Sequence, residues 1–204
     1  MGLMSIKACV IIQKTKRPVL KMQKTLQYGG YMRRILIVVD MQKDFIDGSL
    51  GTREAEAIVK GVTDKIKEYK KEDVFATMDT HKDSYLESQE GKNLPVVHCI
   101  ENTKGWELHP DIAKLIKEEN IFKKPSFGSV DLANKMLELS KAEDIEIELV
   151  GLCTDICVVS NALLIKAFLP EVKISVDSNC CAGVNVEKHN AAIETLRSCQ
   201  VEIK

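Results

Sequence analysis

The regular alternation of short apolar segments with amphipathic ones constrains the fold of this chain more than any other feature. The run ILIVVD at 35–40 has no polar face, which is typical of a strand buried on both sides. Within 55–69, Ile58, Val62 and Ile66 lie four residues apart, on one face of a helix. The pattern predicts strands at 35–40, 74–79, 121–124, 145–151, 172–177 and 200–204, and helices at 55–69, 109–119, 129–140, 155–168 and 187–198.

Strands that alternate with helices form a mostly parallel sheet covered by helices on both faces. We therefore expect an α/β fold with three α/β/α layers and six strands. The 204 residues suit one domain, which we place at 33–204. Residues 1–31 contain six Lys or Arg and no acid, so we interpret 1–32 as a basic, disordered extension or as a start codon assigned too early.

Composition excludes several classes of partner. The net charge of −1 gives no reason to expect nucleic acid or an anionic membrane surface, and no apolar run approaches the roughly 18 residues of a membrane span. Seven cysteines without a Cys-x-x-Cys motif indicate reduced thiols in the cytoplasm rather than disulfides or a zinc ribbon. We expect Cys180 and Cys181 to be small buried residues that close the fifth strand.

Several reactive side chains follow predicted strands, and ligands of parallel α/β proteins bind outside the carboxyl ends of the strands. These candidates are Asp40, Asp79, Lys124, the turn at 151–157 and Asp177. The irregular segment 80–108 follows the second strand, and a loop of this length in a compact domain usually has a function.

The turn GLCTDICV at 151–158 contains a candidate nucleophile. Cys157 lies in the predicted first turn of a helix, where free backbone N–H groups and the helix dipole favour a thiolate or a developing oxyanion. Asp40 can accept the thiol proton, and Lys124 can provide a positive neighbour. The alternative is that Cys153 and Cys157 are small buried residues, Asp40 a solvated acid and Lys124 a surface lysine.

Asp79 and His81 end the second strand, and His98 follows the long segment. Carboxylate and imidazole ligands together suit Zn, Mn or Fe. The alternative is a solvated acidic loop without a metal.

Three separated motifs resemble those of the isochorismatase-like superfamily of cysteine hydrolases, in the same order. ILIVVDMQKDF is similar to V-D-x-Q-x-D-F, KKPSFGS to K-x-x-Y-S-A/G-F, and GLCTDICV to G-V/L-x-T-D-x-C-V. DTHKDSYLESQEGKNLPVVHC resembles the metal loop of the nicotinamidase branch. The resemblance extends from about residue 33 to the C-terminus.

The resemblance implies a catalytic triad with Asp40 as general base and acid, Lys124 as the lysine and Cys157 as the nucleophile. It also implies an oxyanion hole made by the backbone N–H groups of Cys153 and Cys157, and a cis peptide bond between Leu152 and Cys153. Counting along the motif makes Lys124 the match and leaves its neighbour at 123 outside the triad.

The same resemblance implies that Asp79, His81 and His98 bind a divalent metal, with Zn favoured and Mn or Fe as alternatives. A fourth ligand would come from the loop, where we favour Glu90 over Glu87. In the nicotinamidase branch this metal binds the pyridine nitrogen of the substrate while the cysteine attacks the amide.

Two pocket positions depart from the motifs. Phe127 and Gly128 replace the Tyr-Ser pair, which alters a pocket contact but not the triad. Phe45 matches the aromatic residue near the substrate ring, whereas Leu94 stands where nicotinamidases often have Trp. We expect Trp106 to contribute packing rather than substrate contact.

The sequence therefore predicts an amidohydrolase that cleaves a small carboxamide, nicotinamide first, through a cysteine thioester. The alternatives are another cysteine amidohydrolase of the superfamily, for example on an N-carbamoyl compound, and a non-catalytic metabolite-binding member. Isochorismatase activity is disfavoured because a candidate catalytic cysteine is present. The expected partner is a small carboxamide, with no nucleic acid and no membrane, and a homo-oligomer stays open.

Overall fold

The six predicted strands form one parallel sheet in the order β3-β2-β1-β4-β5-β6. The structure is a computed structural model that describes residues 32–204, so the prediction for the basic extension at 1–32 lies outside the described residues apart from Met32. The strands are β1 (Arg33–Val39), β2 (Val74–Asp79), β3 (Ile121–Lys124), β4 (Ile145–Leu152), β5 (Lys173–Ala182) and β6 (Glu202–Ile203).

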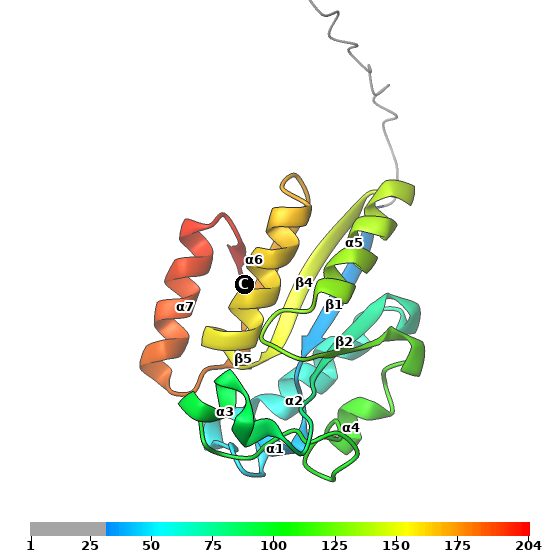
Figure 1. The fold of residues 1–204 in the computed structure, drawn as a ribbon. Coiled ribbons are helices and arrows are strands. Elements are labelled where there is room, and N and C mark those ends of the chain that lie inside the picture. The colour runs from blue at the N-terminus through cyan, green and yellow to red at the C-terminus, as the bar shows by residue number, and fades with distance from the viewer. Residues whose placement is uncertain (1–31) are drawn as a thin grey trace, which may run out of the picture. The chain divides into compact units, whose positions relative to one another are not determined.

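Helices cover both faces of this sheet, as Figure 1 shows. The helices are α1 (Lys43–Ile46), α2 (Arg53–Lys67), α3 (Gln89–Asn93), α4 (Pro110–Ala113), α5 (Val130–Ala142), α6 (Val159–Phe168) and α7 (Val186–Ser198). Single turns of 3-10 helix lie at Lys71–Asp73, Tyr85–Glu87 and Glu118–Asn120, and a π-helical turn lies at Thr154–Val158.

The side chains of β1 alternate between two hydrophobic cores. Ile35 and Ile37 pack with residues of α5, α6 and α7 on one face of the sheet. Leu36 and Val38 pack with residues of α2 and α4 on the other face. All four are fully buried, which is why the run at 35–40 has no polar side. The predicted three-layer α/β/α fold is therefore confirmed.

Two predicted elements are shorter than expected. The helix expected at 109–119 ends after one turn, at Ala113. Glu118 and Glu119 would lie at its C-terminal end, where the helix dipole disfavours negative charge. The last strand is also shorter than the predicted 200–204, because only Glu202 and Ile203 pair with β5.

The fifth strand is longer than predicted and extends to Ala182 rather than ending at 177. Its pairing with β4 shifts register between Leu149 and Gly151, so the strand continues past its polar residues 178 and 179. Asp177 therefore lies inside β5 and pairs with Lys65 of α2 at 2.9 Å, away from the carboxyl ends of the strands. Cys180 and Cys181 are buried near the end of this strand, as predicted.

The segment 80–108 contains more structure than the predicted irregular loop, because it includes the turn at Tyr85–Glu87 and helix α3. The hydroxyl of Ser88 caps α3 by accepting a hydrogen bond from the Gly91 amide at 2.9 Å. Across residues 32–204, no helix has the length and apolar character needed to cross a membrane.

Candidate active site

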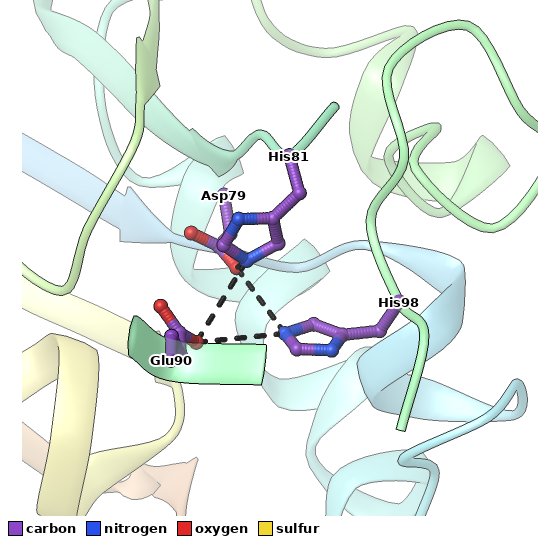
Figure 2. Close-up of side chains that lie close together, drawn as sticks. All are labelled: Asp79, His81, Glu90 and His98. Carbon is purple, nitrogen blue, oxygen red and sulfur yellow. Dashed lines mark ion pairs between the residues drawn. The ribbon is translucent and has the colours of Figure 1, made fainter. Parts of the chain in front are cut away.

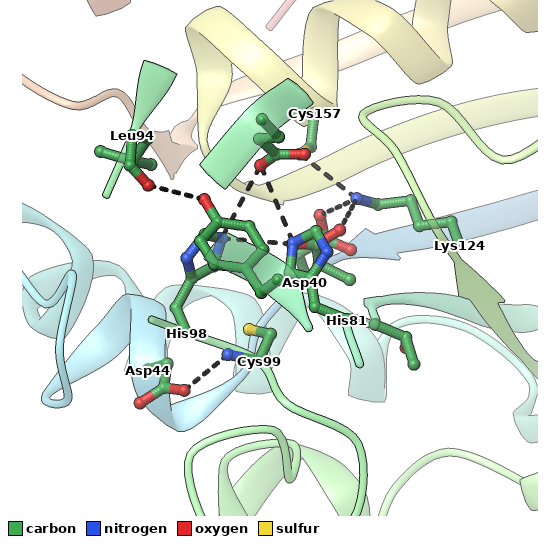
Figure 3. A network of polar contacts seen from close by, with 12 residues as sticks. Asp40, Asp44, His81, Leu94, His98, Cys99, Lys124 and Cys157 are labelled. Carbon is green, nitrogen blue, oxygen red and sulfur yellow. Dashed lines mark hydrogen bonds and ion pairs between the residues drawn. The ribbon is translucent and has the colours of Figure 1, made fainter. Parts of the chain in front are cut away.

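Asp40, Lys124 and Cys157 converge at the carboxyl edge of the sheet, although they come from three distant segments (Figure 3). Asp40 directly follows β1, Lys124 ends β3, and Cys157 lies in the π-helical turn after β4. The Lys124 Nζ atom lies 2.8 Å from Asp40 Oδ2 and 3.4 Å from Cys157 Sγ. Asp40 Oδ1 also accepts a hydrogen bond of 2.6 Å from the Thr77 hydroxyl. The three side chains are buried together.

Burial and charge together set the protonation of this group. Burial lowers the pKa of Lys124, but the surrounding Asp40, Cys157 and Asp79 raise it overall, so the lysine carries a positive charge. Burial raises the pKa of Asp40 against the opposing effect of Lys124, with Asp79 adding to the increase. Asp40 is thereby a stronger base than a solvated carboxylate.

Burial also raises the pKa of the Cys157 thiol well above its ordinary value, and the adjacent Asp40 carboxylate raises it further against Lys124. Desolvation of the sulfur therefore opposes the thiolate that the predicted helix start would favour. Cys157 is a neutral thiol beside a carboxylate that can accept its proton.

The turn before Cys157 approaches β1 very closely. Gly151 has a φ of +117°, and a Cβ there would lie 2.2 Å from the carbonyl oxygen of Val39, so only glycine fits. The peptide bond between Leu152 and Cys153 is cis, as predicted. The carbonyl of Cys153 accepts hydrogen bonds from the amides of residues 156 and 158, at 3.1 and 3.0 Å, and so begins the helical segment close to the predicted position.

A second cluster adjoins the first. One ligand-type atom from each of Asp79, His81, Glu90 and His98 lies within 4.8 Å of the others. Figure 2 shows the four side chains pointing toward one another. Glu90 Oε1 lies 3.8 Å from the Nε2 atoms of both histidines. Helix α3 directs Glu90 to this cluster, whereas Glu87 is exposed in the preceding turn and is not part of it.

The cluster fits a divalent metal by its donor set and by its hydrogen bonds. The Nε2 atom of His81 is buried and makes no well-aligned hydrogen bond, although the Oδ2 atom of Asp79 lies 2.9 Å away. The Nδ1 atom of His98 lies 2.7 Å from the Val96 carbonyl, which can only accept, so Nδ1 carries a hydrogen and the neutral ring would offer the lone pair of its Nε2 to a metal. Two imidazoles and two carboxylates suit Zn, Mn or Fe.

Asp79 connects the two clusters. Its Oδ1 atom lies 3.2 Å from Lys124 Nζ, and its Oδ2 atom lies 2.9 Å from His81 Nε2 and 3.6 Å from His98 Nε2. Burial alone would raise the pKa of Asp79, but the two histidines and Lys124 hold it well below its usual range. The carboxylate is therefore ionised and available to both clusters.

The candidate nucleophile and residues of the metal-type cluster line one pocket of about 510 Å³. Cys153, Cys157, Asp79, Glu90 and His98 all line it. The remaining lining residues are mostly apolar and include the predicted pocket residues Phe45 and Leu94, together with Phe127.

The three residues considered for the pocket on sequence grounds lie in different places. The Phe45 ring lies 5.5 Å from the His98 ring, beside the cluster. Leu94 is 38% exposed and lies at the pocket surface. Trp106 lies outside this pocket, where its Nε1 donates to the Thr80 hydroxyl at 2.9 Å, in keeping with the predicted packing role.

Sequence reasoning assigned no role to two polar residues within its first motif. The side chain of Gln42 is fully buried, donates to the Asp79 carbonyl at 2.9 Å and accepts from the Asp79 amide at 2.7 Å. Asp44 accepts a hydrogen bond of 2.7 Å from the amide of Cys99, next to His98. Both residues belong to the motif V-D-x-Q-x-D-F, and this is the sequence signal that could have identified them as part of the candidate site.

Fold and site together define a class: a parallel α/β protein with an aspartate–lysine–cysteine group at the carboxyl edge of the sheet and a metal-type cluster beside it. The chain belongs to the isochorismatase family, because the family's isochorismatase domain matches residues 34–203.

Characterised relatives share this fold and most of the length of the chain. A nicotinamidase/pyrazinamidase of Mycobacterium tuberculosis is 27% identical over 183 residues, which cover 83% of this chain and 97% of the relative. The pyrazinamidase of Pyrococcus horikoshii, solved in complex with zinc, is 27% identical with a TM-score of 0.69 and covers 84% of this chain and 98% of its own. The N-carbamoylsarcosine amidase of Thermoplasma acidophilum, 22% identical, shares the fold with a TM-score of 0.66 and covers 85% and 96% of the two chains.

Proposed function

We propose that this amidohydrolase cleaves a small carboxamide, nicotinamide first, to a carboxylate and ammonia through a thioester on Cys157. The observation that carries the proposal is the contact of Asp40, Lys124 and Cys157 beside a pocket that Cys157 lines together with three residues of the metal-type cluster. The similarity to nicotinamidases and pyrazinamidases supports the choice of substrate.

The chemistry follows from the protonation of the buried group. Asp40 takes the proton of the Cys157 thiol, and the sulfur forms a bond to the amide carbon. The backbone N–H groups of Cys153 and Cys157 hold the oxyanion, and Asp40 returns the proton to the nitrogen as the C–N bond breaks. Water then loses a proton to Asp40 as its oxygen bonds to the thioester carbon, and the C–S bond breaks as Asp40 returns that proton to the sulfur, which leaves as the thiol. Lys124 stabilises the negative charge that moves between Asp40 and Cys157.

Asp79, His81, Glu90 and His98 would hold a divalent metal, which we propose to be Zn, with Mn or Fe as alternatives. A bound metal supplies a Lewis-acid centre that can orient a ring nitrogen of the substrate. The protein residues keep the donor atoms close together, and Tyr85 packs its ring 4.6 Å from that of His81 and 4.9 Å from that of His98.

Glu90→Gln is expected to lower the affinity for the metal by at least about 10-fold, because it replaces a charged ligand oxygen with a neutral amide. The matched control Glu87→Gln changes an exposed glutamate three residues earlier and should leave metal binding unchanged. Metal content after native purification and titration of the apoprotein with Zn²⁺ measure the difference. Equal affinities in the two variants would show that Glu90 is not a ligand.

A second candidate function is hydrolysis of another amide, such as that of an N-carbamoyl compound. Leu94 at the pocket surface favours this option, because it does not provide the aromatic wall expected for a pyridine ring. A non-catalytic metabolite-binding role is a third candidate, and the buried, charge-matched triad argues against it.

The three candidates separate in an assay of ammonia release by the metal-loaded protein. We expect turnover of nicotinamide and pyrazinamide. Preferential cleavage of N-carbamoyl compounds would favour the second candidate. Absence of ammonia from every carboxamide and N-carbamoyl compound, with metal bound and the fold intact, would favour the third.

We also propose a cytoplasmic location. The six cysteines within residues 32–204 are all free thiols, which is the state expected in a reducing compartment.

A further inference from the structure

Asn161 is a fully buried polar residue on α6, four residues after Cys157. The sequence around it, VVSNALL, indicates an apolar helix face, and an asparagine on such a face costs free energy unless its amide is hydrogen-bonded. The proposed chemistry does not use this side chain, so its position next to the nucleophile needs another explanation.

The side-chain amide of Asn161 makes three hydrogen bonds to the backbone. Its Nδ2 donates to the carbonyl of Cys157 at 2.8 Å and to the carbonyl of Phe127 at 3.1 Å. Its Oδ1 accepts from the amide of Ser129 at 2.9 Å. Both amide hydrogens and the oxygen of Asn161 are therefore hydrogen-bonded to main-chain groups. A side chain without two donor hydrogens and an acceptor cannot make the same three bonds from this position.

These bonds join two segments that each contribute to the candidate active site. The segment 125–129 directly follows Lys124 and ends at Ser129, which caps α5. Two of its residues, Ser126 and Phe127, line the pocket. The other segment is the helical turn that holds Cys157. The segment 125–129 also packs closely against α6, which follows that turn, since a Cβ on Gly128 would lie 3.3 Å from the Leu164 side chain.

We propose that Asn161 is a positioning residue that holds the Cys157 backbone and the pocket wall at 125–129 at a fixed separation. That wall and the sulfur line the same pocket, and a displacement of about 1 Å from the reacting geometry can cost about 100-fold in rate. This inference rests on the proposed function for its activity readout. It adds a determinant of substrate seating that lies outside the triad and the metal-type cluster.

The test uses Asn161→Asp, which keeps the size and shape of the side chain. One oxygen of the aspartate can still accept from Ser129, but the other replaces the donor and faces the carbonyl oxygens of Phe127 and Cys157. We expect kcat to fall by about 10- to 100-fold, with a smaller change in KM. The matched control is Asn134→Asp, the same change at an exposed position of α5, with no change in kcat expected.

A second variant and a second readout keep the test decisive. Asn161→Ser leaves room for water to satisfy the three backbone groups, so the fold survives while the rigid link is lost, and kcat should again fall. The rate at which iodoacetamide alkylates Cys157, followed by mass spectrometry, should drop several-fold in both variants, because the thiol no longer meets Asp40 in the native geometry.

The outcomes separate this inference from the proposed function. Native kcat and native alkylation in the variants, with only a lower melting temperature, would show that Asn161 is merely structural and would overturn the inference. If the wild-type protein cleaves no carboxamide, the proposed function fails, and the alkylation rates alone decide the role of Asn161.

Discussion

Cys157→Ala is expected to lower kcat by at least about 10⁴-fold, to the level left by the pocket and backbone donors alone. Cys157 supplies the only sulfur among the described residues that lies against Lys124, at 3.4 Å, and the proposed thioester cannot form without it. Ammonia release from nicotinamide measures the loss. Mass spectrometry of a rapidly quenched reaction should detect an acyl adduct on Cys157 in the wild-type protein and none in the variant.

Two other cysteines provide matched controls for this prediction. Cys181→Ala removes a buried thiol of β5 outside the pocket lining, and Cys199→Ala removes an exposed one. Both should retain turnover within about 3-fold, although the buried variant loses some stability through its small cavity. Turnover by Cys157→Ala at the level of these controls would refute the nucleophile assignment.

Lys124→Met is expected to abolish turnover and to lower the free energy of unfolding by about 3–5 kcal/mol. The lysine is 1% exposed, and its ammonium lies between the carboxylates of Asp40 and Asp79, at 2.8 and 3.2 Å. Its removal leaves two buried negative charges without their shared cation. Urea unfolding at pH 7, together with the ammonia assay, measures both effects.

The pH dependence of this loss has a definite sign. Without Lys124, the pKa of Asp40 in the folded state rises further above its unfolded value, so the folded variant binds an extra proton as the pH falls. The variant should therefore lose less stability relative to the wild type at pH 5 than at pH 7. A loss that does not depend on pH would indicate that charge is not the cause.

The neighbouring lysine is a matched control for the same substitution. Lys123 is 53% exposed in its side chain and pairs with Glu101 at 2.8 Å on the surface. Lys123→Met should change the stability by no more than about 1 kcal/mol and should leave turnover intact. The opposite result, with Lys123 essential and Lys124 dispensable, would show that the motif was counted in the wrong register.

The hydrophobic pattern predicted the central strands well because their burial is complete. Every residue of β2 is buried, and so is every residue of β1 from Ile35 onward, so the apolar run of β1 is unbroken and that of β2 is interrupted only by Thr77 before the strand ends at Asp79. The pattern failed where polar residues lie inside an element, as in β5, or where charge ends a helix early, as in α4. The register shift in β5 depends on its pairing with β4, which is distant in the sequence.

The sequence predicted which residues come together at the candidate site better than it predicted how they are arranged there. The rule that ligands bind at the carboxyl ends of parallel strands places Asp40, Asp79 and Lys124 at one edge of the sheet from the sequence alone. The same rule wrongly included Asp177, because it depends on knowing where β5 ends. The choice between Glu90 and Glu87 depended on the turn and short helix inside the segment 80–108, which has no strong periodicity.

The sequence by itself determined the α/β class, the family motifs and which reactive side chains follow the first three strands. These features depend on local pattern and on the direction of the chain. Only the tertiary structure decided the protonation of the Cys157 thiol, since desolvation depends on everything packed around the sulfur. It also decided which side chains hold the site together. Asn161 reads as part of an apolar helix face until the backbone of residues 127–129, more than 30 positions away, is brought against it.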